Sequence, residues 1–503
     1  MSPLPAALAP ARVRAHFGAI VESLREAGVL VEAPDADIII AGVSDDSRAV
    51  EQGDLFCAWA GTTHDSHAFV PAAAAAGAVA AIVERRVDAN IPQIVVTDGR
   101  RAAASGAARV FDDPASKLTL VGVTGTNGKT TSAWIMRHLL TARHKTAMIG
   151  TLGVWLDVGG AVAGSEALTT PGPVDLARLF RTLVDRGVTA IAMEVSSHAL
   201  DQGRVDALRY DVALFTNLTR DHLDYHGTLE AYRAAKSRFV ELLRQNGVAV
   251  TNADDPAWDG VGERAPKHVT FSVTPGEAAN VVARDIVLTA EGARFDLVAN
   301  GRSAPVRLPL PGDFNVQNAI GAAAVCLSLG YDLRQVAEML GTLPQVPGRL
   351  ERIAHEPCPV LRDYAHTPDA LERVLLTLRP LVEGRIIVVF GAGGDRDRGK
   401  RPVMGEIAQR LSDIAIVTSD NPRTEDPDAI IDDIVAGMPP DGWRRITDRR
   451  AAIAEALSIA KAGDLVLLAG KGHETYQVLG TTKHDFDERL IVREILAAQR
   501  EVA

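Results

Sequence analysis

Short apolar runs that end in polar or glycine-rich loops recur along the chain, with helical patterns between them. Near the N-terminus such runs cover Asp37–Ile40, Val79–Val83 and Gln93–Val96, and alanine-rich stretches separate them. Short aliphatic runs bounded by turn residues are typical of buried strands. Asp112-Asp113-Pro114 then interrupts the alternation and predicts a linker.

The same pattern continues through the middle of the chain. Leu118–Val123 is an apolar run that leads into a glycine turn, and Thr189–Met193 and Val212–Phe215 are similar runs followed by polar loops. A helical pattern extends from Asn315 to Leu329. Pro344–Gly348 then indicates a second linker.

Three more strands are predicted after this linker, at Arg385–Phe390, Ile414–Thr418 and Asp464–Leu468. Alternating strands and helices are typical of α/β proteins with mostly parallel sheets. Ligands of such sheets bind beyond the carboxyl ends of the strands, so the loops there are the candidate sites. We predict an α/β protein with three domains, at residues 1–115, 116–345 and 346–503, the last of them Rossmann-like.

The composition limits the class of protein. A chain of 503 residues is long enough for about three domains of ~100–200 residues each. The 53 Lys and Arg residues against 64 Asp and Glu residues give a net charge of −11, and the basic stripe typical of nucleic-acid-binding proteins is missing. The apolar runs are far shorter than the ~20 residues of a membrane span.

The cysteines and the first residues indicate in which cellular compartment the protein is expected. Cys57, Cys326 and Cys358 are far apart and form no CxxC motif, which disfavours a zinc ribbon or a disulfide framework and indicates a reducing compartment. The first ten residues are broken by prolines and do not resemble a signal peptide. We expect a cytoplasmic protein without a membrane span, and a monomer.

A phosphate-binding loop is the clearest chemical motif. Residues 125–131 read Gly-Thr-Asn-Gly-Lys-Thr-Thr, after a predicted strand and before a helical pattern. The glycines would let backbone N–H groups close around phosphate, while Lys129 would reach the β- and γ-phosphates and Thr130 would ligate Mg²⁺. Val123 stands where the motif usually has its first glycine, and Gly122 comes one position early. We predict a central domain of the P-loop ATPase type, with ATP bound by Gly125, Thr126, Asn127, Gly128, Lys129, Thr130 and Thr131.

Two polar residues follow other strands of the same domain. Glu194 ends the strand Thr189–Met193, where an acid that binds Mg²⁺ would lie, and His222 is in the loop after another strand. Either residue alone could be an ordinary exposed loop residue.

Lys236 interrupts an apolar helical face. In Thr228–Leu243 the apolar positions fall on one side of a helix, and Lys236 lies on that side, four residues after Tyr232 and three before Phe239. An unpaired buried ammonium group is costly. Lys236 therefore either extends its amine to solvent, or it is chemically altered or meets an anion.

Taken together, these residues resemble the Mur ligase family. The resemblance implies a cytoplasmic, ATP-dependent enzyme that adds an amino acid to a peptidoglycan precursor, with domains for a UDP-sugar, for ATP and for the amino acid. The match extends from about Asp46 to Glu474. Its motifs are Gly125–Thr130, Glu194–His198, Asp221-His222, Lys236, Asp363–His366 and Asp420–Arg423.

The motifs point to one reaction within the family. The resemblance implies that meso-diaminopimelate is added to the D-glutamate γ-carboxylate of UDP-MurNAc-L-Ala-D-Glu through an acyl phosphate. Two alternatives are a lysine-adding ligase and a ligase like folylpolyglutamate synthase, and the Asp420–Arg423 motif argues against both. A third is a nucleotide-binding scaffold, which predicts loss of Lys129, Glu194, His222 or Lys236, and all four are present.

The resemblance also implies roles for individual residues. Thr130 and Glu194 would ligate one Mg²⁺, and His222 with a carbamylated Lys236 would ligate a second. Carbamylation would turn a misplaced cation into an anionic ligand.

Further residues would contact the two nucleotides. Asn315, Asn318 and His366 would contact ATP. Residues 64–67 depart from the family's pattern, so contacts there are less defined. The UDP-MurNAc-dipeptide would be held by Ser47, Thr62, Thr63, His64, Thr169, Thr170, Ser196, Gln202 and Arg204.

The acceptor site would collect loops of the third domain. Diaminopimelate has two carboxylates and two amino groups, so the guanidinium forks of Arg396 and Arg423 suit its carboxylates. Asp420 and Glu474 could bind an ammonium group. Taken alone, residues 420–423 could be a simple Asx-Pro turn. The complete set is Arg396, Asp420, Asn421, Pro422, Arg423, Gly470 and Glu474.

Overall fold

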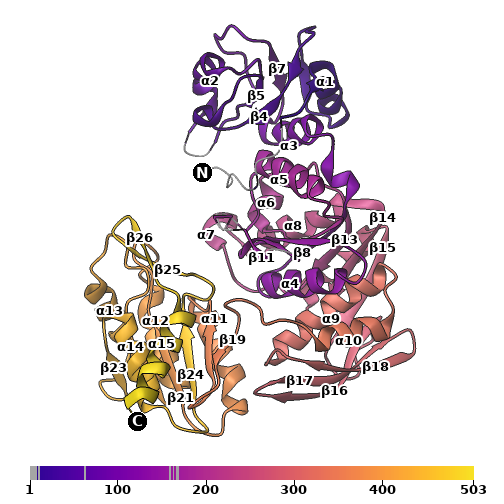
Figure 1. Cartoon of the computed structure of the whole chain (residues 1–503). Helices are drawn as coiled ribbons and strands as arrows, with labels where there is room; N and C mark the ends of the chain where they lie inside the picture. Colours follow the sequence, from indigo (N-terminus) through magenta and orange to yellow (C-terminus); the bar gives the residue numbers. More distant parts are fainter. Residues whose placement is uncertain are drawn as a thin grey trace. The chain divides into compact units, whose positions relative to one another are not determined.

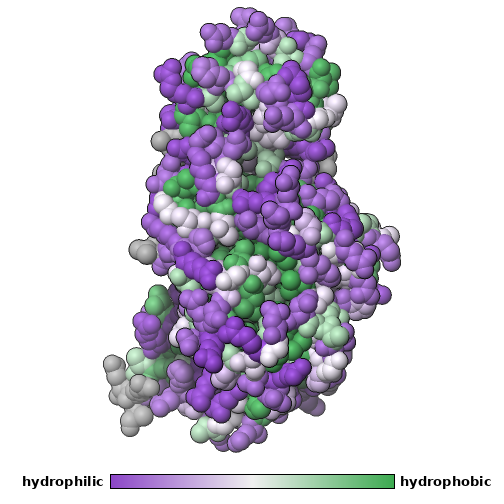
Figure 2. Space-filling model, turned by 90° about the vertical axis from the view of Figure 1, so that its right-hand side faces the viewer, coloured by the Kyte–Doolittle hydropathy of each residue, from purple (hydrophilic) through white to green (hydrophobic). Residues whose placement is uncertain are grey.

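The computed structural model describes residues 8, 12–61, 64–157, 160–162, 164–165 and 169–502. They form two compact units: residues 285–295, 305–316 and 341–503 make up one, and the other described residues make up the other. None of the described helices is both long and apolar enough to cross a membrane. On the face shown in Figure 2, hydrophobic residues form small patches between hydrophilic ones.

The N-terminal part of the first unit contains a five-stranded sheet with helices on both faces (Figure 1). Alternate strand residues point to opposite faces, so Ile82 packs with α1 (Phe17–Glu26) and α3 (Gly99–Val110), and Ala81 packs with α2 (Val70–Ala76). Only β2 runs antiparallel to its neighbour. The strands, in spatial order, are β2 (Leu30–Glu32), β7 (Gln93–Val96), β6 (Ala80–Val83), β5 (Asp54–Cys57) and β4 (Gly42–Ser44). A separate two-stranded ribbon pairs β1 (Ala15–His16) with β3 (Ile39–Ile40).

The larger sheet has β8 (Thr119–Thr124) in its parallel centre, and seven neighbouring strands, from β9 to β16, are parallel. The strands, in spatial order, are β11 (Gly160–Ala161), β10 (Gly153–Leu156), β9 (Thr146–Gly150), β12 (Ala190–Glu194), β8, β13 (Tyr210–Phe215), β14 (Leu243–Asn252), β15 (Lys267–Ser272), β16 (Val281–Thr289), β17 (Gly292–Ala299) and β18 (Arg302–Leu308). The helices of this part are α4 (Lys129–Leu140), α5 (Pro173–Asp185), α6 (Ser197–Asp201), α7 (Leu223–His226), α8 (Leu229–Ser237), α9 (Asp313–Ser328) and α10 (Leu333–Gly341).

The second unit is built on a six-stranded sheet with helices on both faces (Figure 1). One layer contains α11 (Pro368–Leu378), α12 (Lys400–Leu411) and α13 (Pro427–Val435), and the other contains α14 (Arg449–Ile459) and α15 (Glu488–Val502). The strands, in spatial order, are β19 (Glu351–Ala354), β20 (Val360–Asp363), β24 (Leu465–Ala469), β21 (Ile386–Phe390), β22 (Ile414–Val417) and β23 (Trp443–Arg445). All but β19 are parallel, so the loops after β20, β21, β22 and β24 leave one edge of the sheet. The hairpin β25 (Tyr476–Leu479) and β26 (Thr482–Asp485) follows β24.

The α/β class with mostly parallel sheets is confirmed, and most predicted strands are present with small shifts at their ends. Gln93–Val96 is β7 without any shift, whereas Asp37–Ile40 contains only the two-residue β3. The predicted helix Asn315–Leu329 is α9, which starts two residues earlier. The three sheets fall in the three predicted regions, and the exact domain boundaries stay a prediction.

The helical interpretation of Thr228–Leu243 is wrong at its C-terminal end. Helix α8 stops at Ser237, a 3-10 turn covers Arg238–Leu242, and Leu243 begins β14. The reason is tertiary, because Leu243 pairs with Tyr210 of β13 and the chain must enter the sheet at that point. Leu229 is also more than one third exposed, so it is not part of the buried face.

Candidate functional site

The phosphate loop lies between the centre of the larger sheet and the start of α4. Strand β8 ends at Thr124 and α4 begins at Lys129, which is the strand–loop–helix arrangement that the motif requires. Val123 lies inside β8, pairs with Glu194 of β12 and is fully buried. A strand residue needs no glycine there, which explains the departure from the usual motif. Gly122 serves packing instead, since a Cβ on it would lie 2.5 Å from the Phe239 ring.

The two loop glycines have backbones and surroundings that exclude a side chain. Gly125 has φ +147°, and a Cβ on it would lie 1.9 Å from Thr216 Oγ1. Gly128 has φ +85°, and its Cβ would lie 2.2 Å from Asn318 Oδ1. Asn127 N–H donates to Asn217 Oδ1 (2.9 Å). Thr216 and Asn217 therefore fix the loop, and neither was found from the sequence.

Two lysines converge on the same side of the loop. Lys129 Nζ donates to the carbonyls of Gly125 (3.0 Å) and Thr126 (2.8 Å). Lys236 Nζ donates to the Gly125 carbonyl as well (2.7 Å) and lies 4.5 Å from the centre of the Tyr232 ring. The Lys236 side chain is buried, so it does not extend to solvent. Burial, reinforced by the nearby Lys129 ammonium group, lowers the pKa of Lys236 well below its ordinary value.

Glu194 is buried at the end of β12, next to the loop after β9. Its Oε1 accepts from the backbone N–H of Thr151 (2.8 Å) and its Oε2 from the Thr151 hydroxyl (3.2 Å). Gly150 leaves room for this carboxylate, because a Cβ there would lie 2.2 Å from Glu194 Oε1. The strand-end acid predicted from the sequence is thus held by its neighbours rather than solvated.

His222 lies in a group of rings. It directly precedes α7 and has φ +51°, and its ring is 4.8 Å from that of His198, edge to face. His198 also lies 4.2 Å from the Tyr225 ring and 5.5 Å from the His226 ring. His198, Tyr225 and His226 were not predicted as site residues, because a ring cluster has no spacing signal in the sequence. No group of three or more His, Cys, Asp or Glu side chains suited to a metal ion occurs in the described part of the chain.

Five residues predicted to hold the muramoyl dipeptide lie in one network. Thr170 Oγ1 donates to the Glu194 carbonyl (2.8 Å) and accepts from Ser196 N–H (3.1 Å). Thr169 and Thr151 share a hydroxyl contact of 3.1 Å, which connects the network to the carboxylate of Glu194. Arg204 donates to the Thr170 carbonyl (3.1 Å) and through Nη2 to Gln202 Oε1 (2.6 Å). The structure therefore brings together Thr169, Thr170, Ser196, Gln202 and Arg204.

The N-terminal candidates are less connected. Ser47 begins a 3-10 turn capped by Asp46, whose Oδ1 accepts from the backbone N–H of Arg48 (3.0 Å). The Arg48 guanidinium lowers the pKa of Asp46 to about 2. His64 is exposed, and its carbonyl accepts from Gly61 N–H (2.9 Å). Thr62 and Thr63 lie outside the described residues.

Helix α9 carries both predicted asparagines one turn apart. Asn318 lies against Gly128, and Ser132 donates to its Oδ1 (3.4 Å). Asn315 Nδ2 donates to the Pro311 carbonyl (2.7 Å), and its buried Oδ1 has no hydrogen-bond partner among the described residues. Most buried acceptors in folded proteins have a partner, so this oxygen is an exception.

In the second unit, the loops after β22 and β24 meet around Lys471. Its Nζ donates to Asp420 Oδ1 (3.2 Å) and to Asn421 Oδ1 (3.1 Å). Asn421 Nδ2 in turn donates to Glu474 Oε2 (2.9 Å). Burial acts to raise the pKa of Asp420, but the Lys471 and Arg449 cations bring it below its ordinary value. Lys471 was not predicted as a site residue, although it lies between Gly470 and Glu474, which were.

The two predicted arginines flank the loop after β21. A Cβ on Gly393 would lie 3.0 Å from Arg423 Nη1 and 3.8 Å from Arg396 Cγ. Arg423 Nη1 donates to the Gly394 carbonyl (2.7 Å), and Arg423 N–H donates to Val478 of β25 (3.1 Å). Pro422 closes against the same loop, since a Cβ on Gly394 would lie 1.8 Å from its carbonyl oxygen. All seven acceptor residues predicted from the sequence are therefore gathered at one sheet edge.

His366 lies in the loop after β20 of the second unit. Its Nδ1 is 2.7 Å from the Tyr364 carbonyl, and Lys400 Nζ donates to the His366 carbonyl (2.8 Å). Burial lowers its pKa, so the imidazole is neutral at physiological pH.

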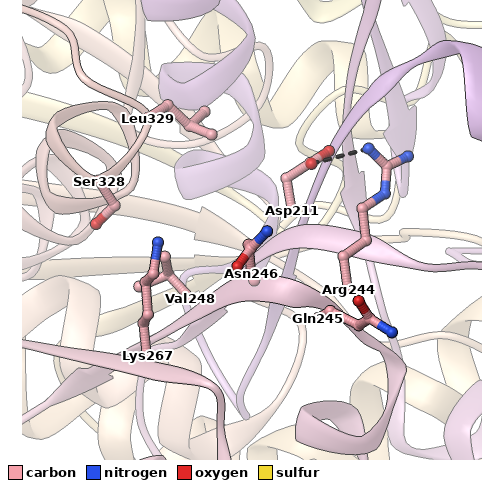
Figure 3. Close-up of a pocket in the computed structure, with 9 residues that line it drawn as sticks. Asp211, Arg244, Gln245, Asn246, Val248, Lys267, Ser328 and Leu329 are labelled. Carbon is pink, nitrogen blue, oxygen red and sulfur yellow. Dashed lines mark hydrogen bonds and ion pairs between the residues drawn. The ribbon is translucent and has the colours of Figure 1, made fainter.

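A polar pocket of about 440 Å³ opens at the other edge of the larger sheet. Figure 3 shows the Asp211–Arg244 ion pair (2.9 Å) on one side and Lys267 on the other. These residues stand at the amino ends of β13, β14 and β15, whereas the phosphate loop follows the carboxyl end of β8. The pocket therefore lies apart from the phosphate loop.

Comparisons with known proteins find matches in each of the three regions that contain the main sheets. Three family models match the chain: the "Mur ligase family, catalytic domain" at residues 39–107, the "Mur ligase middle domain" at 123–326 and the "Mur ligase, glutamate ligase domain" at 348–472.

Individual relatives agree with these models. A protein of Gloeobacter violaceus, named UDP-N-acetylmuramoyl-L-alanyl-D-glutamate–2,6-diaminopimelate ligase, is 46% identical over 471 residues, which cover 92% of this chain and 95% of that protein. A Synechococcus elongatus protein of the same name is 45% identical over 476 residues, which cover 92% of this chain and 95% of that protein. A solved structure with that name has a TM-score of 0.70 at 36% identity and covers 93% of this chain and 98% of its own.

Proposed function

This chain belongs to the Mur ligase family of ATP-dependent ligases, and we propose that it joins meso-diaminopimelate to UDP-MurNAc-L-Ala-D-Glu. The bond formed is an amide between the D-glutamate γ-carboxylate and an amino group of diaminopimelate. ATP is consumed as ADP and phosphate. We place the reaction in the cytoplasm and assign it to a monomer.

The observation that carries the choice of acceptor is the charge pattern at the sheet edge of the second unit. The Arg423 guanidinium and the aliphatic stem of Arg396 lie beside Gly393, and two carboxylates, of Asp420 and Glu474, lie in the adjacent loops. Meso-diaminopimelate presents carboxylates to the first pair and an ammonium group to the second. Lysine lacks the second carboxylate and would leave one guanidinium unused.

Phosphoryl transfer is assigned to the loop 125–131 and the residues around it. The backbone N–H groups of the loop and the N-terminus of α4 would hold the phosphates of ATP. Lys129, which contacts the loop's own carbonyls, would turn to the β- and γ-phosphates when they are bound and balance the charge that develops during transfer. A γ-carboxylate oxygen of the substrate attacks the γ-phosphorus, the bond to the ADP oxygen breaks, and an acyl phosphate forms.

The residues at this site fit Mg²⁺ if Lys236 is carbamylated. Carbamylation requires a neutral amine that attacks CO₂ and loses a proton, and burial beside Lys129 lowers the pKa of Lys236 and so favours the neutral amine. Glu194 and Thr130 would hold one ion, and His222 with the Lys236 carbamate would hold a second, all through the hard oxygen or nitrogen donors that such ions accept. When bound, Mg²⁺ neutralises phosphate charge.

The network around Thr170 is assigned to the peptide end of the UDP-sugar. Arg204 is fixed by Gln202 and by the Thr170 carbonyl, so its guanidinium can meet the substrate's carboxylate without large rearrangement. Thr169, Ser196 and Gln202 supply neutral hydrogen-bonding groups. The uridine end is assigned to Ser47, Thr62, Thr63 and His64.

The second half-reaction uses the acceptor bound by the second unit. The uncharged amine of diaminopimelate attacks the acyl carbon, the C–O bond to phosphate breaks, and the amine loses a proton as the amide forms. Asn315, Asn318 and His366 are assigned to ATP contacts. The unpartnered Oδ1 of Asn315 suits an amino group such as that of adenine.

The test is ADP and phosphate release by the wild-type protein with ATP, Mg²⁺ and UDP-MurNAc-L-Ala-D-Glu, with diaminopimelate, lysine or glutamate supplied in separate reactions. Release and a tripeptide product are expected with diaminopimelate. Turnover with lysine alone would replace the proposed acceptor. Binding of ATP without release in any reaction would indicate a nucleotide-binding scaffold.

A further inference from the structure

Lys471 is a buried lysine at the centre of the proposed acceptor site. Its side chain is 0% exposed, in the loop that follows β24. Its Nζ lies 3.2 Å from Asp420 Oδ1, 3.1 Å from Asn421 Oδ1 and 3.4 Å from Glu474 Oε2. A buried ammonium group is tolerated only where such partners surround it. Its three partners are all residues assigned to the acceptor.

The contacts of Lys471 use only one oxygen of each acid. Asp420 presents Oδ1 to Lys471, while its Oδ2 faces Gly470, where a Cβ would lie 2.8 Å away. Gly470 has φ +113° and carries no side chain, so the space beside Oδ2 stays open. Glu474 likewise presents Oε2 to Lys471 and Asn421, which leaves Oε1 as its second oxygen.

Asn421 is held in turn by the hairpin that follows. Val478 N–H donates to Asn421 Oδ1 (3.0 Å), and Gln477 Nε2 donates to the Asp420 carbonyl (2.6 Å). The loop after β22 and the hairpin therefore form one hydrogen-bonded block with Lys471 inside it. Lys471 is the only ammonium group bonded to both Asp420 and Glu474 among the described residues.

Resting on the proposed function, we propose that Lys471 is a positioning residue that prepares Asp420 and Glu474 for an ammonium group of the acceptor. It occupies one oxygen of each carboxylate and leaves the second, Asp420 Oδ2 and Glu474 Oε1, for a donor of the acceptor. Arg449 and Lys400 also act on Asp420, but Arg449 is paired with Glu488 and Lys400 donates to the His366 carbonyl. Lys471 thus offsets the charge of one of the two carboxylates directly, and an ammonium group of the acceptor would offset the other. The amine that attacks the acyl phosphate must be uncharged, so the ammonium bound here is the one that does not react.

A positioning role for Lys471 should show in how the KM for diaminopimelate depends on pH, whereas a purely structural role should not. Without Lys471, Asp420 loses the main cation that lowers its pKa against burial, so its carboxylate would keep a proton at higher pH than in the wild type. A protonated acid does not attract an ammonium group. The KM for diaminopimelate would then rise as the pH falls from about 8 to about 6.5 in the variant and stay nearly constant in the wild type.

The experiment compares Lys471→Met with Lys461→Met, a control at an exposed lysine ahead of β24. ADP release is measured with the full-length protein while each substrate is varied, at both pH values. For Lys471→Met we expect the KM for diaminopimelate to rise at least ~10-fold, and more at the lower pH, with the KM for ATP and for UDP-MurNAc-L-Ala-D-Glu within about twofold of the wild type. The control is expected to match the wild type.

An unchanged KM for diaminopimelate, or an equal rise for all three substrates, would overturn the inference. If Lys471→Met does not fold, Lys471→Arg decides, because it keeps the charge but replaces a compact ammonium by a planar fork. A selective rise in the KM for diaminopimelate in that variant supports the role, and no rise overturns it. A wild-type protein that uses none of the three amino acids would refute the proposed function itself, which keeps the two failures distinct.

Discussion

Lys129 and Lys236 donate to the same carbonyl oxygen, that of Gly125, from 3.0 Å and 2.7 Å. Two ammonium groups at one neutral oxygen repel each other, so the arrangement favours a neutral amine on the more buried residue. Lys236 is that residue, being 1% exposed. This difference agrees with the two proposed tasks, phosphate binding for Lys129 and carbamylation for Lys236.

Lys236→Ala should reduce turnover by at least ~10–100-fold, the range seen when residues that organise a metal site are removed. A short carboxylic acid added to the variant should restore part of the activity, because it can replace the carbamate. Lys117→Ala, at an exposed lysine that pairs with Asp112, serves as the control and should be neutral. Near-normal turnover in Lys236→Ala would contradict the carbamate.

A second readout does not depend on turnover. Isotope-labelled bicarbonate should give a carbamate signal on the wild-type protein and on Lys117→Ala, detected by magnetic resonance, and none on Lys236→Ala.

The sequence predicted Lys236 better than Lys471 for a physical reason. Lys236 lies on an apolar helical face, so the periodicity between Tyr232 and Phe239 singled it out and left two alternatives, a buried amine or one that extends to solvent. Lys471 lies in a loop, where no period exists, and its burial depends on contacts with Asp420 and Asn421, some fifty residues earlier in the chain.

The end of α8 could not be predicted for the same reason, because it depends on pairing with a strand that is distant in the sequence. The apolar pattern continued past Ser237, but pairing of Leu243 with β13 overrode it. The strand ends were predicted well because parallel strands buried on both faces are continuous apolar runs. His198 was missed because its role depends on ring contacts with His222 and Tyr225.

Gly128→Ala should weaken ATP binding at least ~10-fold, because a Cβ would lie 2.2 Å from Asn318 Oδ1 and push the loop away from α9. Binding of ATP can be measured by calorimetry without turnover. Gly187→Ala is the matched control. Gly187 has a similar φ of +78°, and the nearest heavy atom to its Cβ, Lys145 Nζ, is 3.8 Å away.

Both glycine variants should lose about 1–2 kcal/mol of stability from the left-handed backbone. Only Gly128→Ala should lose ATP affinity. Equal affinities in the two variants would mean that backbone strain, rather than the contact with Asn318, determines the outcome.

Arg423→Lys should raise the KM for diaminopimelate about 10-fold and leave the KM for ATP unchanged, because lysine cannot form the bidentate contact of a guanidinium with a carboxylate. The charge is kept, so the change tests geometry alone. Arg410→Lys, at a half-exposed arginine of α12 that pairs with Glu372, is the control. A parallel rise in the KM for ATP would show that Arg423 instead shapes the loop as a whole.

Asp175→Asn should stabilise the protein at neutral pH. Burial, together with the nearby Asp45, raises the pKa of Asp175 to about 6. In the unfolded chain its pKa is near 3.8, so between these values the folded state holds a proton that the unfolded state has lost. The stability contributed by that proton is therefore present at about pH 4 and is lost as the pH rises through about 6.

Asparagine cannot lose a proton, so the variant avoids this loss. We expect Asp175→Asn to gain about 1–3 kcal/mol of unfolding free energy at about pH 8 and little at about pH 4, measured by urea unfolding. Asp88→Asn, at an exposed loop residue, should show no gain at either pH. An equal gain at both pH values would mean that folding does not raise the pKa of Asp175, and that the gain has a cause other than its titration.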